Sequence, residues 1–346
     1  MKFSAKPVRK TKIAEDDIVL TADPIVSASS VYIGDSEGEI VRIDPPFDRV
    51  AWQVPADGFY PQPGVCKGLL LLISIDGGLR ALDASSGRVV WTVGEEEMPW
   101  ALVGERLLAF REEIEVGDVL TGKRVDRWSV EGAGGSLGLV GNTAQTLVLS
   151  DAAGEDPMRG FLLERKTVIW QRDLMADLLS RASDPPRPGH FALYGSTSGR
   201  AIVDCGRTLF ALSMADGEIL WHHDWWIASR RPVLDGERLY FWARTPDSGA
   251  VRFVCLDEAT GEIIYDRPLE PLGEVFRGQD TTPGFIAGDH IAFGGQAGLI
   301  AVFRLVDGEL TWLYQQRSGI DYPMILGDHL VALALGRKLL VFERTG

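Results

Sequence analysis

Two adjacent histidines mark the stretch whose residue types best suit metal or partner binding. The segment His222-His223-Asp224-Trp225-Trp226 brings imidazole, carboxylate and indole groups together. Neighbouring residues on a strand point to opposite faces, so two adjacent histidines are a poor pair of ligands for one ion. The chain has five histidines, and the other three lie far away in the sequence, at His190, His290 and His329. We interpret the segment as a strand end followed by an aromatic loop, with a metal site or a partner contact as alternatives.

No other segment has the pattern of a catalytic or cofactor site. The HExxH pattern of zinc peptidases is missing from the sequence. The glycine-rich segments 132–135 and 294–295 do not lie between a strand and a helix, so we expect turns rather than phosphate loops. The acidic runs 95–97 and 112–113 are typical of solvated loops. We therefore expect no catalytic residue, no bound metal and no cofactor.

The elements that position these residues are repeats. An aromatic residue closes a β-rich segment about every 43 residues, at Trp52, Trp91, Trp128, Trp170, Trp221, Tyr265 and Trp312. The best copy is the segment 79–91, LRALDASSGRVVW, in which a strand, a turn with a late glycine and a second strand follow one another. The copies that end at Trp128 and Trp170 are the most degraded. A lone hairpin is marginal in water, so these units must be parts of repeated sheets.

A second pair of strands is expected upstream of each hairpin, as in the segment 236–241. Four-stranded units at this spacing predict an all-β fold, a single β-propeller over residues 1–346. After Trp312 the chain supplies three more strands, and we expect residues 1–13 to provide the fourth strand of that last blade. This arrangement gives eight blades; seven blades remain the alternative if one degraded copy is misread.

The repeats resemble the pyrroloquinoline-quinone-type (PQQ-like) β-propeller repeat, in which a Gly-Asp turn precedes Leu-x-Ala-Leu-Asp-x-x-Thr-Gly and a closing Trp. The segments 32–38, 79–91 and 256–262 carry this pattern. The resemblance implies that the closing aromatics dock between neighbouring blades: Trp52, Trp91, Trp128, Trp170, Trp221 and Trp312, with Tyr265 as a substitute. The enzymes of the family bind a quinone next to an adjacent-cysteine disulfide, and this chain has no Cys-Cys pair. Its repeats look more like those of the non-catalytic scaffold members, which include the outer-membrane-assembly lipoprotein propeller.

Charge and cysteine content limit the partners and the compartment. The net charge of −14 argues against nucleic acid and against an anionic membrane surface. The three cysteines, Cys66, Cys205 and Cys255, are odd in number and widely spaced, which indicates reduced structural thiols. The first residues are basic and are not followed by an apolar segment of signal-peptide type. These features predict a cytoplasmic protein.

The connections between blades are the expected binding surface. They carry aromatic and arginine side chains, which are typical of interface hot spots: Tyr60, Trp100, Trp225, Trp226, Arg230, Arg231, Phe276, Arg277 and Tyr322. The segment 173–189 departs from the repeat and predicts an insertion between blades. We expect a non-enzymatic scaffold that binds a protein partner. The partner should have a basic patch that matches the negative charge of this chain. The alternative is an enzyme or small-molecule binder that uses the axial channel.

Overall fold

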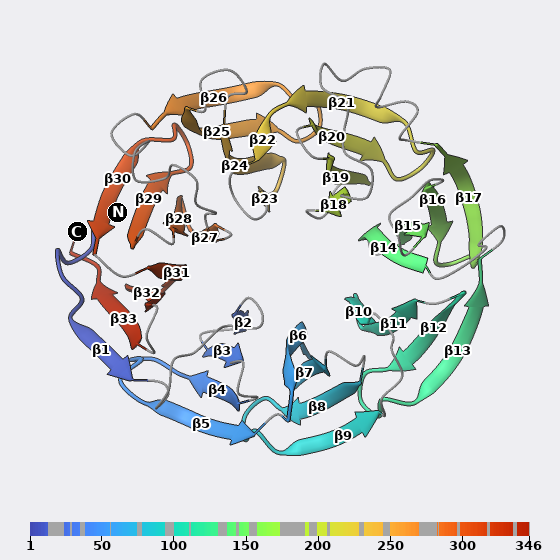
Figure 1. Ribbon diagram of the computed structural model, residues 1–346, viewed down its shortest axis with the longest axis horizontal. Helices are drawn as coiled ribbons and strands as arrows, with labels where there is room; N and C mark the ends of the chain where they lie inside the picture. Colours follow the sequence, from blue (N-terminus) through green and yellow to red (C-terminus); the bar gives the residue numbers. More distant parts are fainter. Residues whose placement is uncertain are drawn as a thin grey trace.

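The computed structural model is a ring of antiparallel sheets around a central axis (Figure 1). It describes residues 1–12, 24–27, 30–34, 39–55, 57–74, 78–93, 100–110, 112–130, 137–142, 145–151, 158–173, 191–193, 199–205, 208–227, 232–244, 250–269, 282, 284–295, 298–316, 319–334 and 338–345. All regular elements among these residues are strands. No helix in the described part of the chain is long and apolar enough to cross a membrane.

Eight sheets form eight blades, which confirms the predicted propeller and its blade count. In the first four blades the strands, from the axis outward, are β2 (Ile25–Ser27), β3 (Ser30–Gly34), β4 (Glu39–Ile43) and β5 (Val50–Pro55); β6 (Phe59–Cys66), β7 (Leu69–Ser74), β8 (Leu79–Asp83) and β9 (Val89–Val93); β10 (Trp100–Val103), β11 (Arg106–Phe110), β12 (Glu113–Asp118) and β13 (Arg124–Ser129); and β14 (Leu137–Asn142), β15 (Thr146–Asp151), β16 (Met158–Leu162) and β17 (Thr167–Arg172).

The remaining blades repeat this order, with one addition in blade 6. Their strands are β18 (Phe191–Leu193), β19 (Arg200–Cys205), β20 (Thr208–Ser213) and β21 (Ile219–Asp224); β22 (Trp226–Ile227), β23 (Val233–Asp235), β24 (Arg238–Arg244), β25 (Val251–Asp257) and β26 (Ile263–Pro268); β27 (Phe285–Ala287), β28 (His290–Gly295), β29 (Leu299–Arg304) and β30 (Leu310–Gln315); and β31 (Ile320–Leu326), β32 (His329–Ala334), β33 (Lys338–Glu343) and β1 (Arg9–Lys12). In blade 6 both β22 and β23 pair with β24.

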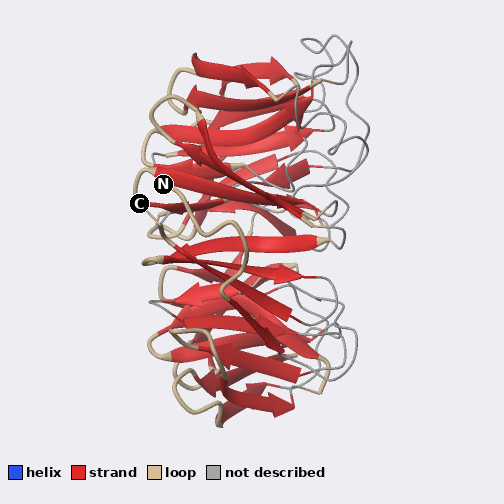
Figure 2. Ribbon diagram, turned by 90° about the vertical axis from the view of Figure 1, so that its left-hand side faces the viewer, coloured by secondary structure: helices blue, strands red, loops and turns tan. Residues whose placement is uncertain are grey.

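The N-terminal strand closes the ring, as predicted. β1 pairs antiparallel with β33, from Arg9 opposite Val341 to Lys12 opposite Lys338. The strand is shorter than the predicted 1–13, and a separate bridge joins Phe3 to Arg344. The two ends of the chain therefore lie side by side (Figure 2). Apart from Asp173, the insertion predicted over 173–189 lies outside the described residues.

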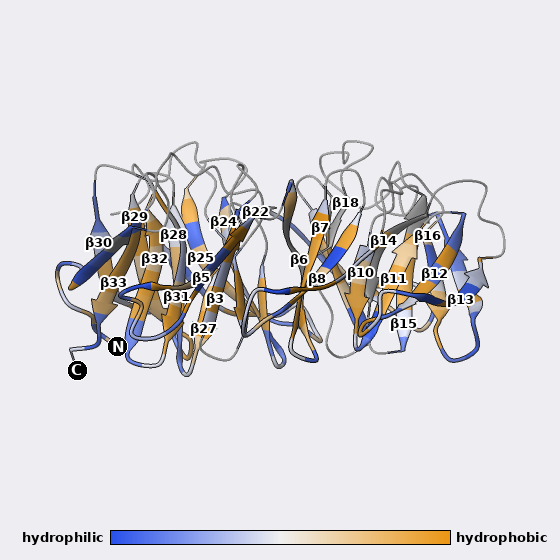
Figure 3. Ribbon diagram, turned by 90° about the horizontal axis from the view of Figure 1, so that it is seen from below, coloured by the Kyte–Doolittle hydropathy of each residue, from blue (hydrophilic) through white to orange (hydrophobic). Residues whose placement is uncertain are grey.

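The hydrophobic core is itself a ring. Each of eight clusters of buried residues joins two neighbouring blades, so that every sheet buries both of its faces. We call the boundary between two blades a seam and name it by its blades. Apolar residues predominate in the inner strands, whereas the turns and outer strands such as β13 are more hydrophilic (Figure 3).

One face of the ring is built from the turn between the first and second strands of each blade and the turn between the third and fourth. We call it the turn face; the two chain ends lie on it (Figure 2). A backbone hydrogen bond joins the two turns of a blade, from Ala84 N to Gly68 O (2.8 Å) in blade 2 and from Leu305 N to Asp289 O (2.8 Å) in blade 7. This repeated bond holds both turns at the same level in the blades where it forms.

Candidate functional site

The closing aromatics lie at the seams, and most reach across to the next blade. The polar atom of the ring donates a hydrogen bond to a carbonyl in the turn between the third and fourth strands of that blade. The bonds run from Trp52 to Ala84 (3.3 Å), Trp91 to Val119 (3.1 Å), Trp170 to Met214 (2.9 Å), Trp221 to Glu258 (2.9 Å) and Tyr265 to Leu305 (3.0 Å). A large ring buried with its donor satisfied is a stable contact.

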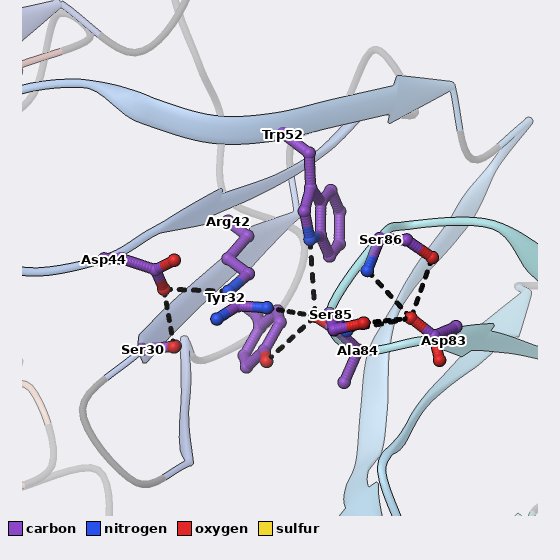
Figure 4. Close-up of polar contacts among 9 residues, drawn as sticks. All are labelled: Ser30, Tyr32, Arg42, Asp44, Trp52, Asp83, Ala84, Ser85 and Ser86. Carbon is purple, nitrogen blue, oxygen red and sulfur yellow. Dashed lines mark hydrogen bonds and ion pairs between the residues drawn. The ribbon is translucent and has the colours of Figure 1, made fainter.

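At seam 1–2 the carbonyl of Ala84 accepts hydrogen bonds from three side chains of the neighbouring blade (Figure 4). The indole of Trp52, the hydroxyl of Tyr32 (3.3 Å) and the guanidinium of Arg42 (2.7 Å) all donate to the carbonyl of Ala84. The carboxylate of Asp83 accepts hydrogen bonds from the hydroxyls of Ser85 and Ser86, which lower the pKa of Asp83 to about 2. The turn that offers the carbonyl is thus held by its own side chains.

A glycine in the same turn makes room for the ring. Gly217 has φ +74, and a Cβ built on it would lie 2.7 Å from Trp170. Gly261 has φ +73 and would place its Cβ 2.6 Å from Trp221. Only glycine combines this backbone conformation with a ring at this distance. These positions support the docking role predicted for the aromatics, which stays a prediction that the stability measurements below can test.

Two closing tryptophans make different contacts. Trp128 donates to the carboxylate of Asp126 in its own strand (2.7 Å) and stacks on Phe161 of blade 4, with ring centroids 6.1 Å apart. Trp312 packs edge-on against Phe3 at 5.5 Å and Phe342 at 5.2 Å. In seam 7–8 the N-terminal segment therefore supplies part of the aromatic packing.

The predicted partner contacts do not form one described surface. Trp100 on β10 is half-buried and packs on the cluster of seam 2–3. Trp225 is half-buried in seam 5–6, where it packs against Phe241. The backbones of Tyr60 and Trp226 lie in β6 and β22. The side chains of these last two residues lie outside the described part of the chain, as do the following residues entirely: Arg230, Arg231, Phe276 and Arg277.

Tyr322 is not an exposed contact. Its side chain is only 8% exposed and belongs to the core cluster of seam 8–1. Tyr322 has φ +49, and the pairing of β31 with β32 shifts its register between Asp321 and Met324. Such a bulge re-aims a side chain, so a residue that the prediction assigned to an exposed connection lies in β31 with its side chain turned inward.

The two adjacent histidines have separate environments. His222 is exposed, whereas the Nε2 atom of His223 lies 2.7 Å from the carbonyl of Gly261 in the next blade. The ring of His223 also stacks on Trp225, with centroids 4.8 Å apart and planes 9° apart. Within the described residues, no three His, Cys, Asp or Glu side chains are placed to hold one metal ion. The geometry favours a structural role for His223 in seam 5–6.

The described thiols are unpaired. Cys66 is half-buried, and Cys255 is buried. Burial raises the pKa of the Cys255 thiol to about 11, so it stays protonated and unreactive at neutral pH. The side chain of Cys205 lies outside the described residues.

Charge is distributed unevenly around the turn face, a feature that the sequence interpretation missed. The six described turns in blades 5–8 contain no Lys or Arg and nine acidic residues: Asp216, Glu218, Glu237, Glu258, Glu262, Asp289, Asp307, Glu309 and Asp328. Of these, Glu258 is buried and pairs with Arg200, so eight can contribute to the surface charge. The described turns of blades 2–4 carry Glu105 and Glu164 against five basic residues: Lys67, Arg88, Lys123, Arg165 and Lys166. We call these regions the acidic half and the basic half. The signal in the sequence is the acid beside each turn glycine, as in the dipeptides at 236–237, 288–289 and 327–328.

A groove of about 430 Å³ opens where blade 6 meets blade 7. One wall is the end of β26, with Arg267 and Leu269, and the other is the last turn of blade 7, with Asp307 and Glu309. Its lining is mostly apolar, and its volume falls within the range of ligand-binding clefts.

Comparison with known proteins places the chain among PQQ-like propellers, which confirms the predicted resemblance. The family model described as "Outer membrane protein assembly factor BamB" matches residues 4–154 and 205–346. Outer membrane protein assembly factor BamB of Yersinia pestis is 31% identical over 88 residues, which are 25% of this chain and 22% of that protein. That alignment therefore spans about a fifth of the relative.

Solved structures share the whole fold. BamB from Moraxella catarrhalis matches with a TM-score of 0.58 at 15% identity and covers 97% of this chain and 98% of its own. The computationally designed protein Ika8 matches with a TM-score of 0.69 at 13% identity, over 98% of this chain and 99% of its own. A quinohemoprotein alcohol dehydrogenase from Pseudomonas putida matches with a TM-score of 0.63 at 12% identity, over 96% of this chain and 75% of its own. At these identities the structures show a common fold and no common chemistry.

Proposed function

The chain belongs to the family described as outer membrane protein assembly factor BamB, and from this premise we propose that it is a non-enzymatic scaffold that binds protein partners during outer membrane protein assembly. The observation that carries the proposal is the extent of the family match. Its two stretches, 4–154 and 205–346, include strands from every blade and both strands that close the ring. They leave out β16 and β17 of blade 4 and, except for Cys205, β18 and β19 of blade 5. A rigid ring that displays loops from separate blades suits binding without conformational change.

The prediction of a cytoplasmic protein is wrong. The matching family and the relative from Yersinia pestis are described as assembling outer membrane proteins, a task carried out beyond the cytoplasm. The cysteines misled the prediction. Cys255 is buried, and a buried thiol without a neighbour within disulfide reach stays reduced in an oxidising compartment as well. An odd number of cysteines therefore says little about where the protein acts.

Crosslinking in a bacterium with an outer membrane tests the proposal. A tagged copy of the full chain is expressed there, crosslinked in intact cells, purified from the envelope and analysed by mass spectrometry. We expect components of outer membrane protein assembly to be enriched at least about tenfold over a tagged unrelated propeller. Equal recovery with both baits would contradict the proposal.

The surface that makes this contact is a separate question, and we propose the predicted residues Trp225, Trp226 and Arg230 for it. A variant with all three changed to Ala should lose crosslinked partner. Because Trp225 packs against Phe241 in seam 5–6, a second variant changes only Trp226 and Arg230, and its thermal unfolding should stay within a few degrees of wild type. The matched control changes three exposed residues of β13, Arg124, Val125 and Arg127, to Ala. Equal partner recovery by the triple variant and this control would show that another surface binds.

A further inference from the structure

The groove between blades 6 and 7 combines an apolar floor with an exposed apolar rim. Phe303 and Leu269 form the buried floor, and Leu310 lines the groove while remaining 37% exposed. Val306, which is 64% exposed, lies in the turn of blade 7 next to Asp307 of the groove wall. Apolar side chains gathered at an open groove indicate a binding site, whereas single exposed ones do not.

The groove lies at the seam where a tyrosine replaces the closing tryptophan. Tyr265 reaches the carbonyl of Leu305 with its hydroxyl. A Cβ built on Gly308, which lines the groove, would lie 2.6 Å from the Tyr265 ring. The phenol therefore lies directly behind the groove wall. A phenol fills less space than an indole, so the substitution is consistent with an open groove at this seam.

The charges around the groove indicate which chain would enter it. Asp307 and Glu309 on its wall belong to the acidic half, and both pair with Arg304. Arg267 also lines the groove, and its Nε donates to the carbonyl of Asp307 (2.8 Å), so the charges of the lining itself are balanced. The excess negative charge comes from exposed acids in neighbouring turns, which include Glu262 and Asp289. Arg304 lowers the pKa of Asp307 to about 2, so this wall stays ionised at any physiological pH. A field of this sign attracts Lys and Arg and repels acidic chains.

We propose that the groove binds an extended segment of a protein partner in which an aliphatic or aromatic side chain enters between blades 6 and 7 and flanking Lys or Arg residues meet the acidic half of the turn face. This rests on the proposed function, because it specifies the chemistry of the partner. A second copy of this chain fits less well, since two molecules that each carry a net charge of −14 repel one another.

Synthetic peptides test the groove without any need to know the partner. The probes are a fluorescent peptide in which Lys and Leu alternate, a second in which Glu replaces Lys and a third in which Ser replaces Leu. Binding to the full chain is measured by fluorescence anisotropy at low and physiological salt. We expect the Lys/Leu peptide to bind at least about tenfold more tightly than either of the others, with an affinity that falls as salt rises.

A pair of variants locates the site. Leu310→Arg places a cation in the groove and should weaken the Lys/Leu peptide by about tenfold or more. The matched control is Ile169→Arg on β17 of blade 4, where the side chain is 39% exposed against 37% for Leu310. Circular dichroism and thermal unfolding verify that both variants are folded. If either fails to fold, Leu310→Ser and Ile169→Ser replace them, with a smaller loss expected for Leu310→Ser alone.

Several outcomes would overturn the proposal. Equal binding of the Lys/Leu and Lys/Ser peptides would mean that the acids attract cations and the groove takes no side chain. Equal effects of the two Arg variants would place binding elsewhere. A dimer in analytical ultracentrifugation that Leu310→Arg dissociates would make a second copy the occupant. None of these results would touch the proposed function, which depends on enrichment of assembly components in cells.

Discussion

Seams 4–5 and 3–4 are each closed by a buried tryptophan but differ in the polar contact that the indole makes. In seam 4–5 the indole of Trp170 donates to the carbonyl of Met214 in the next blade, and Gly217 lies against the ring. In seam 3–4 Trp128 donates to Asp126 in its own blade, and the position that corresponds to Gly217 is Lys166, with φ 53. The backbone bonds from Met214 N to Gly199 O and from Leu163 N to Gln145 O, both 2.8 Å, establish the correspondence.

The difference shows that the contact at a seam has two separable parts, the packing of the ring and the hydrogen bond that the ring donates. The ring supplies burial at both seams, since Trp170 and Trp128 are 8% and 5% exposed. Of these two seams, only seam 4–5 has a hydrogen bond from the indole to a backbone carbonyl of the next blade, in a turn whose glycine makes room for the ring. At seam 3–4 side chains replace them: the ammonium of Lys166 lies 2.5 Å from Asp126 and 5.5 Å from the Trp128 ring. A seam can therefore keep its packing while its polar contact moves from backbone to side chains.

Removing the rings should have the largest effect and should not distinguish the seams. Trp170→Ala and Trp128→Ala are each expected to lower the free energy of unfolding by about 3–5 kcal/mol, because each empties a buried ring site. Urea unfolding followed by circular dichroism measures this loss. A loss below about 1 kcal/mol at either position would contradict the docking role of that tryptophan.

Phenylalanine at the same positions should separate the seams. Trp170→Phe leaves the carbonyl of Met214 without its indole donor and should cost about 1–3 kcal/mol more than Trp128→Phe. The acceptor of Trp128 is the carboxylate of Asp126, whose side chain is 41% exposed and open to water after the substitution. Similar losses for the two variants would mean that the bond across seam 4–5 adds little to burial.

Replacing the glycine that makes room for the ring should have an intermediate effect on the free energy of unfolding. Gly217→Ala puts a Cβ against Trp170 at a positive φ, and strain and overpacking together should cost about 2–4 kcal/mol. Lys166→Ala occupies the corresponding position, where a side chain already fits, and should cost less than about 1 kcal/mol. Gly236→Ala is the control: its φ is +60 with nothing within 4 Å of the Cβ, so only the strain of about 1–2 kcal/mol remains. If Gly217→Ala costs no more than Gly236→Ala, the ring is not a constraint on the turn.

Much of this architecture was visible in the sequence, because repeats declare themselves through spacing. The aromatics predicted eight blades, and the three strands after Trp312 predicted closure by the N-terminal segment. The degraded copy before Trp170 already showed a lysine where the glycine was expected. The sequence did not show what this lysine implies for the seam. The indole of Trp128 donates to Asp126, and that choice of acceptor depends on the side-chain rotamer rather than on a sequence pattern.

The candidate site was much less predictable than the fold. The acidic half is assembled from turns more than a hundred residues apart, and only the closed ring brings Asp216 and Asp328 onto one face. The groove depends on how the end of β26 meets the turn of blade 7, which no local pattern encodes. Tyr322 was assigned to a connection between blades, whereas it lies within β31, at a bulge that turns its side chain into the core.

The smallest expected effect is the pH dependence that Asp126 contributes at seam 3–4. Hydrogen bonds from Lys166 and Trp128 lower the pKa of Asp126 from 3.8 to about 2. A carboxyl whose pKa is lower in the folded state stabilises the fold above its unfolded pKa, and this contribution is lost as the pH falls toward 2. Asp126→Asn should therefore lower the urea midpoint at pH 5 and have progressively less effect between pH 4 and pH 2.

The control variant is Asp83→Asn. The pKa of Asp83 is also lowered to about 2, but by hydroxyls within its own turn. Combined with Trp128→Phe, the Asp126 effect should shrink and the Asp83 effect should not, because only Asp126 holds the indole. If both effects stayed the same in that background, the seam would not be using the carboxylate as its polar contact.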